Sequence, residues 1–179
     1  MRIRKCVLIV NGKPRAGKDT FAEILGGFIP VYKYSMVEKV KSIALDCGYE
    51  GKKDEKDRKF LADLKKLTDE YSNLSMNDVI DRISQFALDE IKELIFVVDV
   101  REPSDIRFLK QQTGAFTVFI DNKNVPEITS NEADANVNKY NYDFHVGNNG
   151  TKEEFQENIY EFLWALLALI KVPDDSENN

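Results

Sequence analysis

The sequence predicts an α/β fold, in which a parallel sheet is covered by helices on both faces. Two short apolar runs, residues 6–10 and residues 94–100, are rich in β-branched residues and have the length of strands buried on both sides. A glycine-rich segment, residues 12–20, separates the first run from a helical pattern. Strands that alternate with helices in this way are typical of parallel sheets.

Capping residues and glycines indicate the helix boundaries. Thr151 and Glu154 predict a capping box for the last helix, and Ser75 and Asp78 predict a similar start for an earlier one. Gly26 and Gly27 predict the end of the helix that follows the glycine-rich segment. The predicted helices cover residues 20–25, 36–47, 56–72, 76–92, 103–114 and 151–171, and the predicted strands cover residues 3–11, 31–35, 94–100, 116–120 and 142–146.

The composition is that of a globular protein with one domain. The 179 residues are 42% hydrophobic and 31% charged, and the net charge of −6 argues against a general DNA or RNA binder. Cys6 and Cys47 are too few for a disulfide framework and are interpreted as structural thiols. The apolar residues 162–170 are far short of the ~20 that span a bilayer, so we expect a cytoplasmic protein without a membrane partner.

The glycine-rich segment GKPRAGKDT matches the pattern G-x-x-x-x-G-K between a predicted strand and a predicted helix. Glycines let the backbone wrap closely around phosphates, and successive amide N–H groups and the positive helix end then face the anion. Lys18 can reach the β- and γ-phosphates. The segment is therefore predicted to bind ATP and Mg²⁺. The predicted contact residues are Gly12, Lys13, Arg15, Ala16, Gly17, Lys18, Asp19 and Thr20.

Individual residues of this segment allow more than one interpretation. Asp19 stands where many such loops carry a Ser or Thr ligand of Mg²⁺; it either holds the ion through water or caps the helix, because carboxylates suit both places. Thr20 is assigned to the phosphate and Mg²⁺ environment. Arg15 either contacts the γ-phosphate or is an exposed arginine.

A second candidate group follows the predicted strand at residues 94–100. Asp99 lies at its carboxyl end, where ligands bind in parallel sheets, and can hold Mg²⁺ water or accept a proton. Arg101 can clamp an acceptor phosphate through its planar guanidinium. The alternative is an Asp99–Arg101 pair that caps the next helix. Lys18, Asp99 and Arg101 form the predicted catalytic set.

The chain resembles the deoxynucleoside monophosphate kinases of the bacteriophage type, within the P-loop kinase group. The resemblance is carried by residues 12–20, 34–41, 57–64, 97–110 and 130–155, and its most specific parts are GKDT, DVR and NNGT. It implies transfer of the γ-phosphoryl group of ATP to a nucleoside monophosphate.

The resemblance also implies the architecture and further site residues. It implies a P-loop NTPase fold with five strands in the order 2-3-1-4-5 and one domain at residues 1–172. In that domain, residues 50–93 form a helical acceptor-binding flap and residues 121–141 a lid-like excursion, and residues 173–179 are predicted to be a disordered tail. The implied acceptor residues are Ser35, Lys41, Arg58 and Arg101, and Asn148 and Gly150 are implied to lie near the adenine.

One feature departs from the family pattern. Kinases usually bring arginine over the transferring group, but between Asp121 and Asp143 the sequence has Lys123 and Lys139 and no arginine. Two alternatives therefore remain: a kinase for another small acceptor, of the dephospho-coenzyme A or phosphomevalonate type, and a nucleotide-binding regulator without turnover. Small-molecule nucleotides are the expected partners, and a homodimer that uses Trp164 is one alternative for the oligomeric state.

Overall fold

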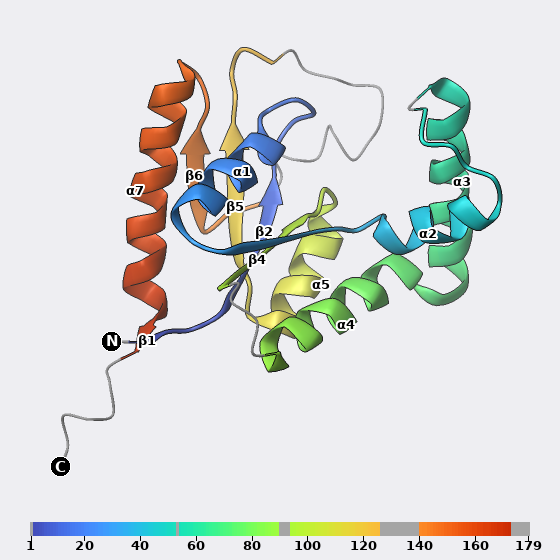
Figure 1. Cartoon of the computed structure of the whole chain (residues 1–179), viewed down its shortest axis with the longest axis horizontal. Coiled ribbons are helices and arrows are strands. Elements are labelled where there is room, and N and C mark those ends of the chain that lie inside the picture. The colour runs from blue at the N-terminus through green and yellow to red at the C-terminus, as the bar shows by residue number, and fades with distance from the viewer. Residues whose placement is uncertain (1, 53, 90–93, 126–139, 173–179) are drawn as a thin grey trace.

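The computed structural model describes residues 2–52, 54–89, 94–125 and 140–172 (Figure 1). Its main sheet contains five parallel strands in the order β3-β4-β2-β5-β6, which is 2-3-1-4-5 when these strands are numbered along the chain. The predicted fold class is therefore confirmed. The strands are β2 (Cys6–Asn11), β3 (Val31–Ser35), β4 (Ile95–Asp99), β5 (Phe116–Asp121) and β6 (Phe144–Gly147).

Helices cover both faces of this sheet (Figure 1). Side chains of successive strand residues point to opposite faces, so β2 contributes Leu8 to one core and Ile9 to the other. The first core is closed by α1 (Lys18–Phe28) and α7 (Lys152–Ile170), and the second by α4 (Leu74–Leu88) and α5 (Pro103–Thr113). The central strand is therefore buried on both sides, as its continuous apolar sequence requires.

Beyond the β3 edge, α2 (Glu38–Asp46) and α3 (Glu55–Ser72) lie outside the two layers (Figure 1). No residue of α3 is fully buried, and this helix packs mainly on α2 and α4. By contrast, α4 buries Val79, Ile83 and Phe86 against the sheet. Of the two helices described in the predicted flap, α3 therefore projects from the body of the protein and α4 packs against the sheet.

Three predicted helix boundaries are wrong. α1 continues through Gly26 and its neighbour to Phe28, so these glycines do not end it. α4 begins at Leu74 rather than after Ser75, because Asn73 takes a left-handed conformation with a φ of 50° and reverses the chain there. The same helix ends at Leu88, short of residue 92, and residues 90–93 lie outside the described part.

Other boundary predictions are confirmed. Thr151 and Glu154 form the capping box: the Thr151 hydroxyl accepts from the Glu154 amide at 3.2 Å, and the Glu154 carboxylate accepts from the Thr151 amide at 2.8 Å. Pro103 begins α5, and Gly114 ends it with a φ of 67°. An antiparallel pair that was not predicted joins β1 (Arg2–Ile3) to β7 (Lys171–Val172). Most of the excursion (126–139) and the tail (173–179) lie outside the described residues.

Within the described residues, no helix combines the length and the apolar character needed to cross a membrane. The two cysteines are free, and they differ in environment. Cys6 is largely covered by the sheet, and burial raises the pKa of its thiol to about 12. Cys47 is exposed at the end of α2. The structural interpretation therefore suits Cys6, whose thiol stays protonated at neutral pH.

Candidate phosphotransferase site

The segment between β2 and α1 forms a tight loop at the carboxyl edge of the sheet (Figure 1). It needs unusual backbone angles: φ is 154° at Gly12, 65° at Arg15 and 104° at Gly17. Gly17 is the N-cap of α1, and its carbonyl accepts from the Phe21 amide at 2.8 Å. The N-terminus of α1 therefore faces the inside of the loop, where amide groups and the helix dipole favour an anion.

Replacing Gly17 with alanine is expected to damage both the loop and its ligand binding. A Cβ at this position would lie 2.5 Å from the Asn148 Nδ2, and a left-handed residue with a side chain is itself strained. We expect a loss of about 1–3 kcal/mol in the free energy of unfolding, together with weaker ATP binding. Thermal unfolding and calorimetry measure the two effects. A variant with the wild-type melting temperature would contradict the described loop geometry, and Gly27→Ala in α1, where a Cβ meets nothing within 4 Å, is the control.

Lys18 lies across this loop. Its ammonium donates to the carbonyl of Gly12 at 2.9 Å and to the carbonyl of Lys13 at 3.2 Å. The Lys13 carbonyl also accepts from the Ala16 amide, which closes the turn. The ammonium is thus held beside the inner wall of the loop, where the phosphates of a bound nucleotide would replace carbonyl oxygens as its acceptors.

The turn after β6 is fastened to the loop by Asn148. The Asn148 side chain donates to the Ala16 carbonyl at 2.8 Å, and its backbone amide donates to the Asp121 carbonyl at 2.7 Å. Gly150 leaves space for the Glu154 carboxylate that completes the α7 capping box. Asn148 therefore borders the loop, while the contacts of Gly150 are those of a helix start, and the implied place of both residues near the adenine stays a prediction.

Asp99 ends β4 beside the loop. It is in register with Val10 of β2 on one side and with Ser35 of β3 on the other. One of its carboxylate oxygens, Oδ1, is buried and makes no hydrogen bond within the described residues. Burial raises the pKa of Asp99, while the positive charges of Lys18, Lys33 and Arg101 oppose this shift and the negative charge of Asp19 adds to it. Asp99 is therefore a partly buried carboxyl group among three cations.

These features fit a nucleotide with Mg²⁺. The loop offers amides and Lys18 to phosphates, and the unpaired Asp99 oxygen is an acceptor of the kind that Mg²⁺ or its water ligands need. Asp19 lies exposed in the first turn of α1 and forms an ion pair with Lys33 of β3. Thr20 lies in the same turn and is partly buried. Arg15 is exposed at the tip of the loop.

Arg101 is exposed after β4, next to the start of α5. Its charge acts on Asp99, and its carbonyl accepts from the side chain of Asn11 at 3.1 Å. The sequence analysis did not identify Asn11, although a polar residue at the end of an otherwise apolar strand is a visible signal. Tyr142, which also bonds Asn11, was likewise missed.

The other implied acceptor residues are spread over β3, α2 and α3. The Ser35 hydroxyl, at the end of β3, accepts from the Val37 amide at 3.4 Å. Lys41 of α2 pairs with Glu38 of the same helix at 3.6 Å. Arg58 is exposed near the start of α3. Of these residues, the structure brings only Ser35 next to Asp99.

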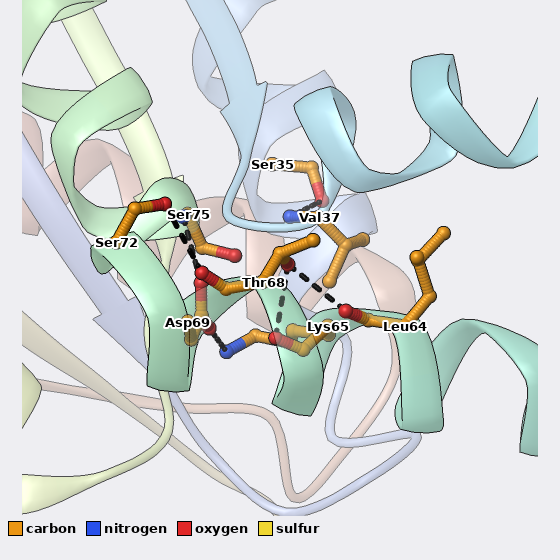
Figure 2. A network of polar contacts seen from close by, with 8 residues as sticks. All are labelled: Ser35, Val37, Leu64, Lys65, Thr68, Asp69, Ser72 and Ser75. Carbon is orange, nitrogen blue, oxygen red and sulfur yellow. Dashed lines mark hydrogen bonds and ion pairs between the residues drawn. The ribbon is translucent and has the colours of Figure 1, made fainter.

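A polar joint connects α3 to α4 (Figure 2). One oxygen of Asp69 accepts from the Ser75 amide at 2.8 Å, and the other accepts from the Lys65 ammonium at 2.5 Å. Asp69 thereby caps α4, a role that the sequence analysis gave to Ser75. The Ser75 hydroxyl is buried and makes no hydrogen bond within the described residues. Asp105 of α5 lies close enough for the charges of Lys65 and Asp69 to act on its pKa, which burial raises.

Comparisons with known proteins agree with this architecture. No protein-family model matches the chain, and no curated protein matches its sequence. Among solved structures, the Thermus thermophilus protein TT1252 superposes with a TM-score of 0.52 at 13% identity, over 92% of this chain and 98% of that one. A gluconokinase from Sinorhizobium meliloti 1021 gives a TM-score of 0.50 at 13% identity, over 94% of this chain and 97% of that one. The chain therefore has the fold of the P-loop kinases.

Proposed function

We propose that this protein is an ATP-dependent phosphotransferase whose acceptor is a small phosphorylated molecule, namely a nucleoside or deoxynucleoside monophosphate. The observation that carries the proposal is the placement of Asp99 beside the loop that holds Lys18, with a buried carboxylate oxygen left unbonded. A carboxylate in this place can hold water ligands of Mg²⁺ or accept the proton of an attacking group, and the second of these roles is specific to an enzyme. The shared fold of a gluconokinase supports the reaction class.

The donor half of the proposed site is the loop between β2 and α1. Its amides and Lys18 bind the phosphates of ATP, and Asn148 fixes the side of the loop at which the adenine would enter. Mg²⁺, when bound, would supply positive charge that offsets the charge of the phosphates. Asp99 would hold water ligands of that ion or accept the proton of the attacking group. Thr20 and Asp19 would lie beside the phosphates and the ion.

The acceptor half of the proposed site lies at the ends of β3 and β4. Arg101 offers a planar pair of donors to the acceptor phosphate, and Ser35 offers a hydroxyl group beside Asp99. Arg58 and Lys41 supply further positive charge from α3 and α2. We further propose that residues 50–93 act as the acceptor-binding flap and residues 121–141 as the lid.

A panel of acceptors tests this function. The full chain is incubated with ATP, Mg²⁺ and each nucleoside or deoxynucleoside monophosphate in turn, and ADP release is followed. We expect acceptor-dependent ADP release with at least one monophosphate and formation of the corresponding diphosphate. Dephospho-coenzyme A, phosphomevalonate and gluconate belong in the same panel because they separate other kinases from a nucleotide kinase. ATP binding without ADP release for any acceptor would select a regulator without turnover.

Arg101→Lys is expected to weaken binding of the acceptor without weakening binding of ATP. Lysine keeps the charge and loses the planar fork, so it is a poor substitute at a phosphate clamp. The acceptor kcat/KM should fall about tenfold to a hundredfold, as for the loss of about 1–3 kcal/mol of charge-assisted hydrogen bonding, while the KM for ATP stays near its wild-type value. Steady-state kinetics with each substrate varied in turn measure both values.

The same kinetics distinguish other roles of Arg101. A fall in kcat with both KM values unchanged would place it on the transferring phosphoryl group. An unchanged acceptor KM and kcat would remove it from the acceptor site. Arg107→Lys is the matched control, because Arg107 is exposed on α5 beyond the start of the helix.

A further inference from the structure

Asn11 occupies an unusual place in the sheet. It ends β2 after four buried apolar residues, and its own side chain is completely buried. An apolar side chain would satisfy such a position at no cost in desolvation, whereas a buried amide is tolerated only when its polar groups are bonded. The presence of an amide therefore needs a reason in the contacts that it makes.

The Asn11 amide joins three segments that are far apart in the sequence. Its Oδ1 accepts from the Gly12 amide at 2.8 Å, which holds the first residue of the phosphate-binding loop. Its Nδ2 donates to the Arg101 carbonyl at 3.1 Å and to the Tyr142 hydroxyl at 2.7 Å. The planar amide of Asn11 thus links the loop, the segment after β4 and the segment just before β6.

We infer that Asn11 is a positioning residue that couples the phosphate-binding loop to Arg101. When phosphates bind in the loop, Gly12 is displaced. The side-chain amide of Asn11 transmits this displacement to the backbone of Arg101 and so to its guanidinium group. Because a misplacement of about 1 Å at a reacting centre costs on the order of a hundredfold in rate, such a link bears directly on turnover. The inference rests on the proposed function in taking Arg101 as an acceptor ligand.

Two variants distinguish a loss of the link between Asn11 and Arg101 from a general loss of stability. Asn11→Asp keeps the shape and the oxygen that accepts from Gly12, but at most one of the two donated bonds can survive. Tyr142→Phe removes only the hydroxyl and leaves the bond from Asn11 to the Arg101 carbonyl in place. Thr117→Val is the control for stability, since Thr117 is a buried residue of β5 in register with Ile9 of β2, and its hydroxyl bonds Asp143 rather than Asn11.

The first measurement is the nuclear magnetic resonance spectrum of ¹⁵N-labelled protein with and without ATP. In the wild type and in Tyr142→Phe, ATP should shift the amide of Gly17 and the side-chain Nε resonance of Arg101. In Asn11→Asp, the shift at Gly17 should remain and the shift at Arg101 should disappear. A shift at Arg101 that persists in Asn11→Asp would overturn the inference.

The second measurement is steady-state kinetics. In Asn11→Asp the acceptor kcat/KM should fall about tenfold to a hundredfold while the KM for ATP remains close to the wild-type value. A purely structural Asn11 would instead behave like Thr117→Val, with a lower melting temperature and unchanged KM values for both substrates, and that result would also overturn the inference.

The experiments also cover a variant that does not fold and a wild-type protein that phosphorylates no acceptor. If Asn11→Asp does not fold, Asn11→Ser replaces it, because the shorter hydroxyl group cannot reach Arg101 and Tyr142 together. If no acceptor is phosphorylated by the wild type, the proposed function fails, and the resonance shifts still decide the coupling because they need only ATP binding.

Discussion

Lys18→Ala is expected to abolish most of the ATP turnover while the protein remains folded. The ammonium is held inside the loop by the carbonyl groups of Gly12 and Lys13, and a phosphate that enters the loop gains a charge-assisted partner there. Loss of a preorganised donor of this kind costs about 100-fold to 1,000-fold in rate. Acceptor-dependent ADP release measures the loss, and calorimetry should show much weaker ATP binding.

The fold of Lys18→Ala should survive because the lost contacts lie on the loop surface. Two hydrogen bonds to backbone carbonyls disappear, at a net cost of about 1–3 kcal/mol. Lys59→Ala, which removes an exposed lysine of α3, is the control and should change neither ATP binding nor turnover. Unchanged ATP affinity and turnover in Lys18→Ala would refute phosphate binding by this loop.

Asp99→Asn is expected to separate activity from stability. Turnover should fall about 10²–10⁴-fold because the amide can neither accept a proton nor hold the water ligands of a cation as a carboxylate does. ATP binding should remain, since the loop itself is unchanged. Kinetics at saturating substrates and calorimetry measure the two effects.

The stability of Asp99→Asn should rise at neutral pH in metal-free buffer. Burial raises the pKa of Asp99 in the folded state above its unfolded value, so the folded protein holds this proton more tightly. The stability that this group contributes is present below the unfolded pKa and is lost as pH rises through the folded pKa. Asparagine, which never ionises, avoids that loss.

The gain in melting temperature should therefore shrink as the pH falls toward the ordinary carboxyl range. Asp105→Asn is a matched control, because burial also raises the pKa of Asp105, and it should gain stability without the loss of turnover. A fall in the melting temperature of Asp99→Asn with a normal rate would support the alternative in which Asp99 only shapes the start of α5.

The sequence pattern was sufficient for the alternation of strands and helices and for those boundaries that depend on local chemistry, whereas the order of the strands in the sheet was implied by the resemblance. Thr151, Pro103 and Gly114 mark helix ends through groups within a few residues of the boundary, and all three are confirmed. The start of α4 depends instead on Asp69, six residues before Ser75 and on another helix. A search for a capping residue next to the apolar pattern could not find a cap supplied across a turn.

A similar distinction holds for the candidate site. The loop residues are adjacent in the sequence, so the spacing of glycine and lysine identifies them together. Asn11 and Tyr142 lie 131 positions apart, and only the folded sheet brings their side chains within 2.7 Å. The acceptor residues fall between these cases, since Ser35 and Asp99 meet through strand register, which a single sequence does not specify.

The joint at Asp69 has a mechanical consequence for α3. The Asp69 carboxylate is fixed by Lys65 on its own helix and accepts from the Ser75 amide of α4, so the two helices cannot hinge at Asn73 without breaking the bond to Ser75. With 1.5 Å of rise per residue, Arg58 lies about 16 Å from Asp69 along α3. The joint at the inner end of the helix therefore limits how far the outer end, with Arg58, can move independently of α4.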